Sequence, residues 1–285
     1  YVALAIGFVT LLIGFLVFAP GKRLTGTADP QIVGKSDALD SKSKPLTSAE
    51  FADLCRTDPV LALEESKKCY QRLMKDTQAI GYTCTFIKQE KIKDKLKTRE
   101  VIACEFQEEP FAVLMNWQEG KGRAETMLYA KDQNDNQLCI VPSSELAKKA
   151  LRFAGKYPAR RTLESDDAKE ASREPANQFG IFNSTVRTYD AWLESHKVKT
   201  LAVAYEGIQP VAELNGHLCY VLHRTCTPPE DGVTEVYAYL STTNHLQVGT
   251  MLKDNEDQLL GSYYFRDLVP VTTFPADRFD VARFK

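Results

Sequence analysis

The sequence has few of the groups from which enzyme sites are built. Among its 285 residues are only four histidines, and it lacks both a Gly-x-Ser-x-Gly nucleophile motif and a glycine-rich junction that could hold phosphate. Its formal net charge of −2 is too small to favour a polyanionic partner, which argues against nucleic acid. We therefore expect a protein that is not an enzyme and needs no cofactor.

The histidines are also poorly placed for a metal. His217 and His223 share one face of an expected strand with Cys219, but six strand residues span roughly 20 Å. Two imidazoles at that separation cannot bind one ion. Ser195 and His196 are adjacent in sequence, which is not the geometry of a catalytic triad. No catalytic residue and no metal ligand is predicted.

An uncharged apolar run occupies residues 1–19. About 19 apolar residues are enough to cross a hydrocarbon core of roughly 30 Å, so one interpretation is a transmembrane anchor. The other is a cleaved signal peptide, because Ala19 fits a cleavage site, although Pro20 would block it. Residues 20–46 are polar and rich in Gly, Ser, Asp and Lys, which predicts a flexible linker before a folded domain at 47–285.

Three consecutive strands are expected over residues 99–107, 111–118 and 123–129, because short turns separate runs rich in Val, Ile, Met and aromatic residues. The middle strand is apolar on both of its faces for most of its length. Such a strand is covered on both sides, so another part of the chain or a ligand must lie over the second face.

Helices are expected at four places. Thr47 and Glu50 have the spacing of a capping box, which starts a helix at residue 48, and Pro59 can open a second helix that ends near Gln78. A short helix is expected over 144–154, and Asn183-Ser184 caps a helix to about residue 195. Between them, residues 157–178 read as a long polar loop.

Period-two alternation elsewhere predicts the remaining strands, which lie over residues 82–90, 137–141, 200–206, 211–215, 217–225, 234–240, 246–253 and 259–268. The fold class is therefore α+β. About eleven strands form one antiparallel sheet that is too large to stay flat and that curls around helices on one side.

The seven cysteines bear on the compartment. If residues 82–90 pair with 98–107, Cys84 falls opposite Cys104, close enough for a disulfide at a non-hydrogen-bonded position. Cys55 and Cys69 could meet across a helical hairpin. Disulfides would indicate an oxidising, extracytoplasmic location, whereas seven buried reduced thiols are the alternative.

Three segments resemble a known family. The run LNGHLCYVL at 214–222, GSYYFRDL at 261–268 and FPADRFD at 274–280 are similar to motifs of domain of unknown function 1571. That family resembles the lipoprotein-carrier (LolA/LolB-like) superfamily. The resemblance implies a half-open antiparallel barrel with helices on its concave side and, in the best-known relatives, acyl chains held between sheet and helices.

Large apolar side chains on many strands are expected to face inward. As ordinary core they fill volume, and as a lipid site they line a tapered cavity. Sequence pattern does not separate these two alternatives, because both place apolar residues on the same face. The predicted ligand-binding residues are Phe86, Val113, Met115, Trp117, Met127, Tyr129, Tyr220, Leu222, Tyr237, Tyr239, Met251, Tyr264 and Phe265.

These observations lead to two hypotheses. The first is a membrane-tethered module on the extracytoplasmic side, periplasmic or at the cell surface, which binds a lipid or a lipidated protein without catalysis. In that case the loop at 155–178 and the helix at 183–195 would act as a lid. The second is a cell-envelope module with a filled core, whose surface binds another envelope protein.

Overall fold

The computed structural model describes residues 45–284. The predicted anchor or signal at 1–19 and nearly all of the predicted linker at 20–46 lie outside the described residues. Within the described residues, no helix is long and apolar enough to cross a bilayer.

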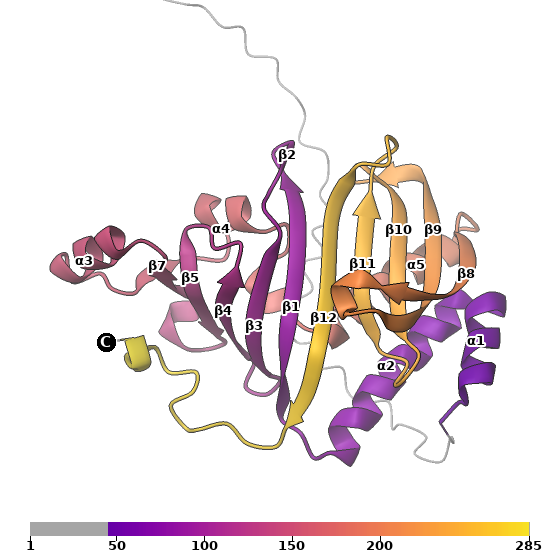
Figure 1. The fold of residues 1–285 in the computed structure, drawn as a ribbon, viewed down its shortest axis with the longest axis horizontal. Coiled ribbons are helices and arrows are strands. Elements are labelled where there is room, and N and C mark those ends of the chain that lie inside the picture. Colours follow the sequence, from indigo (N-terminus) through magenta and orange to yellow (C-terminus); the bar gives the residue numbers. More distant parts are fainter. Residues whose placement is uncertain (1–44, 285) are drawn as a thin grey trace, which may run out of the picture. The chain divides into compact units, whose positions relative to one another are not determined.

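One large, open antiparallel sheet runs through this part of the chain (Figure 1), as predicted. Its spatial order is β7-β6-β5-β4-β3-β1-β12-β11-β10-β9-β8, with the short β2 paired to β1. The strands are β1 (Gly81–Ile92), β2 (Lys95–Leu96), β3 (Glu100–Gln107), β4 (Ala112–Glu119), β5 (Ala124–Ala130), β6 (Leu138–Pro142), β7 (Ala159–Arg161), β8 (Ala202–Val211), β9 (His217–Glu230), β10 (Val233–Ser241), β11 (Gln247–Lys253) and β12 (Leu259–Val271).

The helices follow the predicted caps closely. The first helix begins at Ser48 with the predicted capping box, in which the Glu50 N–H donates to the Thr47 side chain and the Glu50 carboxylate accepts from the Thr47 N–H. Asp58 caps the second helix, whose first residue is Pro59. The α-helices are α1 (Ser48–Thr57), α2 (Pro59–Asp76), α3 (Glu145–Phe153), α4 (Asp166–Ala171) and α5 (Ile181–Lys197), and the short 3₁₀ turns are η1 (Asn134–Asn136), η2 (Ala176–Gln178), η3 (Ala212–Leu214) and η4 (Val281–Phe284).

Three local predictions are wrong. The polar stretch at 157–178 contains β7, α4 and η2, because the Ser165 side chain accepts from Ala168 N at 3.3 Å and starts a helix there. Helix α5 begins at Ile181, two residues before the predicted cap, after Gly180 at φ 122°. Of the predicted strand at 211–215, only Val211 is extended, as the last residue of β8, and residues 212–214 form the turn η3, which leaves Asn215 in the left-handed region at φ 55°.

The two faces of the sheet carry different partners. The face on which α2 and α5 lie is called the inner face. There Gln247 N of β11 donates to Ser66 Oγ of α2 at 3.0 Å, and Ile181 N of α5 donates to the Tyr82 hydroxyl of β1 at 3.0 Å. The opposite side is called the outer face.

The C-terminal residues cover part of the outer face. Phe279 is buried against Leu114 of β4, Leu128 of β5 and Cys139 of β6. Arg278 forms an ion pair with Glu105 of β3 on the same face. Both faces of β4 are therefore covered, as predicted, and the cover of its outer face is the chain's own C-terminal segment.

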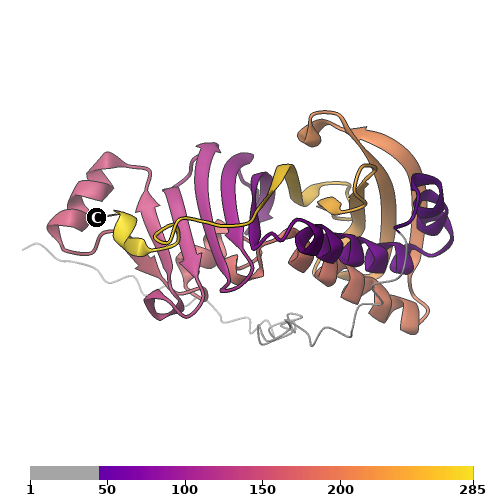
Figure 2. The ribbon, with the colours of Figure 1, turned by 90° about the horizontal axis from the view of Figure 1, so that it is seen from below.

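The sheet has two halves that bury their inner faces against different elements. In the second half, β8 to β12, the strands curl around α1, α2 and α5 (Figure 2). Their buried cluster combines Phe51, Leu63 and Trp192 of the helices with Tyr220 and Leu222 of β9, all less than 2% exposed. The first half comprises β1 and β3 to β7, and only the C-terminal part of α2, through Tyr70 and Met74, and the start of α5, through Ile181, pack in its buried cluster.

Candidate ligand-binding face

Strand register divides the thirteen predicted ligand-binding residues between the two faces. Nine lie on the inner face, namely Phe86, Val113, Met115, Trp117, Met127, Tyr129, Tyr220, Leu222 and Phe265. Four lie on the outer face, so the expectation that they point inward is wrong. These are Tyr237 and Met251, which pair across β10 and β11, and Tyr239 and Tyr264, which both pair with Gly249 of β11.

The first half holds the larger inner group. Cys84, Cys104, Met115 and Met127 form one row across β1, β3, β4 and β5, and neighbouring rows contain Val113, Tyr129 and Trp117. Met115 and Met127 are less than a tenth exposed. Flexible, polarisable methionines beside aromatic rings suit a surface that adapts to apolar partners of different shape.

Residues 162–180, called the covering segment, lie over this inner face together with Tyr70 and Met74 of α2 and Ile181 of α5. The covering segment's Leu163, Ala168, Ala176 and Phe179 pack against the same apolar cluster as Met115 and Met127. Phe179 is its deepest side chain, with ring centroids 5.2 Å from Phe86, 5.8 Å from Phe106 and 5.7 Å from Phe265.

The covering segment is itself poorly buried. None of residues 162–178 is fully buried, although the inner face beneath them is. Segments with few buried apolar contacts open locally at a smaller free-energy cost than a packed core does. The covering segment should therefore cost less free energy to displace than the packed strands beneath it.

Two buried charges hold the segment in place. Lys88 Nζ donates to Glu90 Oε2 at 2.8 Å and to the Ala171 carbonyl at 3.2 Å. Glu90 Oε1 accepts from Arg173 N at 3.0 Å and Ser172 Oγ at 3.3 Å, as well as from the Tyr263 hydroxyl of β12 at 2.8 Å. The covering segment thus docks on a polar anchor at one end and on Phe179 at the other.

The electrostatics of this anchor keep both groups charged. Burial alone would raise the pKa of Glu90, but the Lys88 ammonium and the hydrogen bonds from Arg173 and Tyr263 hold that pKa below its ordinary value. Burial alone would lower the pKa of Lys88, but Glu90 and Glu100 raise it above its ordinary value. Sequence reasoning missed this pair, although charges at alternate positions of an otherwise buried strand are the signal that could have found it.

The inner face of the first half is largely buried, with Ile102 and Val113 inaccessible to solvent. Two open pockets lie near α3, with volumes of about 430 Å³ and about 370 Å³, and charged side chains such as Lys148, Arg152 and Arg160 are among their lining residues. Neither pocket is lined by any of the thirteen predicted residues. A ligand on the inner face would therefore have to take the place of the covering segment.

The cysteines lie in separate environments. Cys84 and Cys104 oppose one another across β1 and β3, as predicted, but all seven cysteines carry free thiols, so neither predicted disulfide is present. Cys55 of α1 is buried with Phe51, whereas Cys69 of α2 accepts from Arg72 Nη2 at 3.1 Å. Burial raises the pKa of Cys55 and of Cys219 to about 12, so neither is poised as a nucleophile.

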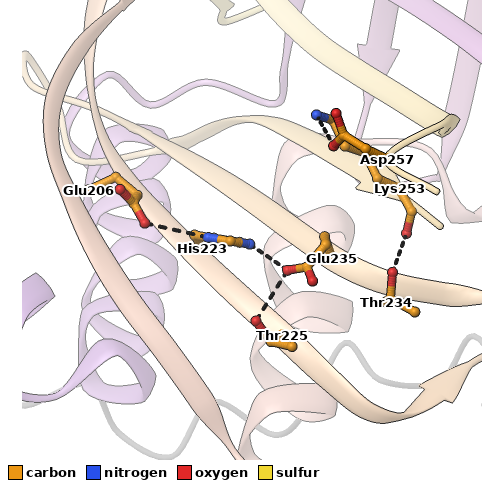
Figure 3. Close-up of polar contacts among 7 residues, drawn as sticks. All are labelled: Glu206, His223, Thr225, Thr234, Glu235, Lys253 and Asp257. Atoms are coloured by element: carbon orange, nitrogen blue, oxygen red, sulfur yellow. Dashed lines mark hydrogen bonds and ion pairs between the residues drawn. The ribbon is translucent and has the colours of Figure 1, made fainter. Parts of the chain in front are cut away.

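A polar cluster lies on the outer face of the second half (Figure 3). His223 Nε2 is 2.5 Å from Glu235 Oε2, and His223 Nδ1 is 3.4 Å from Glu206 Oε1. The imidazole stacks on Tyr237 with centroids 4.2 Å apart, and Thr225 donates to Glu235 at 3.2 Å. Residues 45–284 contain no group of three or more His, Cys, Asp or Glu side chains that could hold a metal ion.

The chain thus forms one open antiparallel sheet, with the helices and the covering segment on its inner face. A family model described as protein of unknown function (DUF1571) matches residues 79–283, so the chain belongs to that family. The family predicted from the three sequence segments is thereby confirmed. Comparison with curated protein sequences gives no match.

Several solved structures are similar at low identity. The MucA/MucB complex of Pseudomonas aeruginosa is 14% identical, with 76% of this chain and 61% of that chain covered and a TM-score of 0.39. Lipoprotein LppX of Mycobacterium tuberculosis is 11% identical, with 75% and 100% covered and a score of 0.35. A LolA superfamily protein of Nitrosomonas europaea is 9% identical, with 75% and 98% covered and a score of 0.21. At these scores, the similarities say nothing of what this chain binds.

Proposed function

We propose that this protein is a non-catalytic, extracytoplasmic module, tethered to a membrane through residues 1–19, that binds the acyl chain of a lipid or of a lipidated protein. The chain would lie on the inner face of the first half, in the place of the covering segment. The ligand-binding residues would be Phe86, Val113, Met115, Trp117, Met127, Tyr129 and Phe265.

One observation carries this proposal. The Met- and aromatic-rich inner face of the first half is covered by a segment in which residues 162–178 include no fully buried residue. Displacing such a cover exposes a continuous apolar surface, and an acyl chain laid on it gains about 0.8 kcal/mol per buried methylene. Helix α5, which the sequence placed in the lid, buries Trp192 in the core of the second half and Ile181 in the cluster of the first half, so we assign the lid to the covering segment alone.

The test is binding of fluorescent fatty acyl probes of increasing length by the full chain in a mild detergent. We expect affinity to rise with each methylene, and Met127→Ala to reduce that increment. Leu252→Ala is the matched control, since Leu252 packs against the helices in the second half. The melting temperature of each variant separates loss of binding from loss of fold. The proposal would be refuted if affinity did not depend on chain length, or if Met127→Ala and Leu252→Ala reduced the affinity gained per methylene equally.

A second candidate is an envelope protein that binds another protein through its surface. It is favoured by the filled inner face, where Val113 and Ile102 are inaccessible to solvent. If it is correct, no lipid will co-purify with the full chain, and hydrophobic probes will not compete for the first half. Mass spectrometry of co-purified lipids separates the two functions.

A further inference from the structure

Helix α3 presents an apolar ridge to solvent. Leu146 is 79% exposed and Phe153 is 98% exposed, and Ala150 between them is also exposed. These residues are spaced i, i+4 and i+7, so they lie along one face of the helix. Exposed large apolar side chains grouped in this way mark an interaction surface more often than a chance arrangement does.

The opposite side of α3 holds the helix on the sheet. Lys148 is only 9% exposed, and its Nζ lies 2.8 Å from both Glu125 of β5 and Glu145. The ridge is therefore held facing away from the sheet, and Figure 1 shows α3 at the end of the sheet beside β7. No residue among those that the structure describes covers Leu146 or Phe153.

The ridge lies within a basic region of a weakly acidic protein. Residues 145–161 contain six basic side chains and one acidic side chain, Glu145, which gives this stretch a net charge of +5 in a chain whose net charge is −2. Its basic residues are Lys148, Lys149, Arg152, Lys156, Arg160 and Arg161. Lys148 and Arg161 pair with Glu125 and Asp167 from outside the stretch, so the docking surface depends on Lys149, Arg152 and Lys156. Arg152 also stacks over the Tyr157 ring at 4.2 Å from its centroid, which adds an amphipathic aromatic group beside the ridge.

We infer that α3 docks on the surface of an anionic bilayer, with Leu146 and Phe153 inserted at the level of the headgroups and Lys149, Arg152 and Lys156 against the lipid phosphates. Apolar residues on one face and basic residues around them are the pattern of an interfacial helix. A second copy of the chain fits less well, because two such basic regions repel one another. This inference goes beyond the proposed function, since it concerns how the domain meets a membrane rather than what it holds.

The experiment places a tryptophan on the ridge. The full chain with Phe153→Trp is added to phosphatidylcholine vesicles with brominated acyl chains, with and without phosphatidylglycerol. Leu218→Trp is the control, because Leu218 is 48% exposed but lies on β9 in the second half. Fluorescence of the unsubstituted protein corrects for Trp117 and Trp192.

We expect at least a twofold stronger quenching at residue 153 than at residue 218 when phosphatidylglycerol is present. The double variant Lys149→Glu with Arg152→Glu, or high salt, should remove that excess. Equal quenching at the two positions, or no dependence on anionic lipid, would overturn the inference. So would a shift of residue 153 emission that depends on protein concentration in the absence of lipid, which would identify a second copy as the occupant.

This experiment is separable from the proposed function. Met127→Ala changes the face beneath the covering segment and leaves α3 untouched, so quenching at residue 153 should persist. Conversely, the double charge reversal on α3 should leave the dependence of acyl-probe affinity on chain length unchanged. If only the quenching result fails, membrane docking by α3 is wrong. If only the dependence on chain length fails, the proposed acyl-chain binding is wrong.

Discussion

The two halves of the sheet bury their inner faces by different means. In the second half, three helices supply large side chains such as Phe51, Leu63 and Trp192, all inaccessible or nearly so. In the first half, the ends of α2 and α5 contribute Met74 and Ile181, and the rest of the cover is a partly exposed stretch of chain that is held by the Lys88–Glu90 pair and by Phe179. The difference shows that equally apolar strands can be covered by buried helices in one place and by a partly exposed segment in another, and we propose that only the second cover is removable.

The largest loss of stability is expected for a substitution in the core of the second half. Replacing Trp192, which is 1% exposed, by alanine should lower the free energy of unfolding by about 4 kcal/mol, because it removes a fully buried ring. Urea unfolding followed by circular dichroism measures the loss. Val198→Ala, at a residue 68% exposed, is the control and should change little. A loss under about 1 kcal/mol for Trp192→Ala would mean that the helices are not the core of this half.

The next effect concerns the polar anchor of the first half. Glu90→Gln should lower the free energy of unfolding by about 3 kcal/mol, because it leaves the buried Lys88 ammonium without its main partner. Hydrogen exchange should then accelerate in residues 162–178 and remain slow in α5. The control is Glu230→Gln, which alters the Arg224 ion pair in the second half. If hydrogen exchange accelerates equally in α5, the covering segment does not open separately from the rest of the domain.

Acid should open the first half selectively. The pKa of Glu90 is lowered in the folded state. Its contribution to stability is therefore present above the pKa of the unfolded state, near 4.5, and is lost as the pH falls through the lower pKa of the folded state. As the pH is lowered below 4.5, protection from hydrogen exchange should therefore be lost in residues 162–178 at a higher pH than in α5. In Glu90→Gln this pH dependence should disappear. Simultaneous loss in both halves would refute the comparison.

The smallest effect is expected at the exposed rim of the covering segment. Lys93 Nζ lies 2.6 Å from Glu170 Oε1, but both side chains are largely exposed, and such ion pairs contribute little. Glu170→Gln should leave both the unfolding midpoint and the exchange of residues 162–178 unchanged. A clear acceleration of exchange would show that the rim, rather than the Lys88–Glu90 pair, holds the segment.

Much of the framework could be predicted from sequence. Alternating apolar residues and short turns located nearly all the strands, and the capping box at Thr47 located the first helix, because both signals are local. The expected pairing of residues 82–90 with 98–107 also placed Cys84 opposite Cys104. The family followed from segments near the C-terminus.

What could not be predicted depends on contacts between distant parts of the chain. Tyr237, Tyr239, Met251 and Tyr264 lie on the face opposite the helices, although Tyr264 is buried there, since period two does not say which side the helices occupy. Lys88 and Glu90 look like ordinary surface charges until Arg173, 83 residues after Glu90, is placed beside them. The C-terminal cover of β4 is equally non-local.

The most direct measurement uses a fatty acyl probe with a photoreactive group at the end of its chain, cross-linked to the full chain and located by peptide mass spectrometry. The account predicts labelled peptides from β4 and β5, which contain Met115 and Met127, and increased labelling in Glu90→Gln. Labels on the inner residues of β9 such as Leu222, on α3 alone, or on no part of the inner face would contradict it.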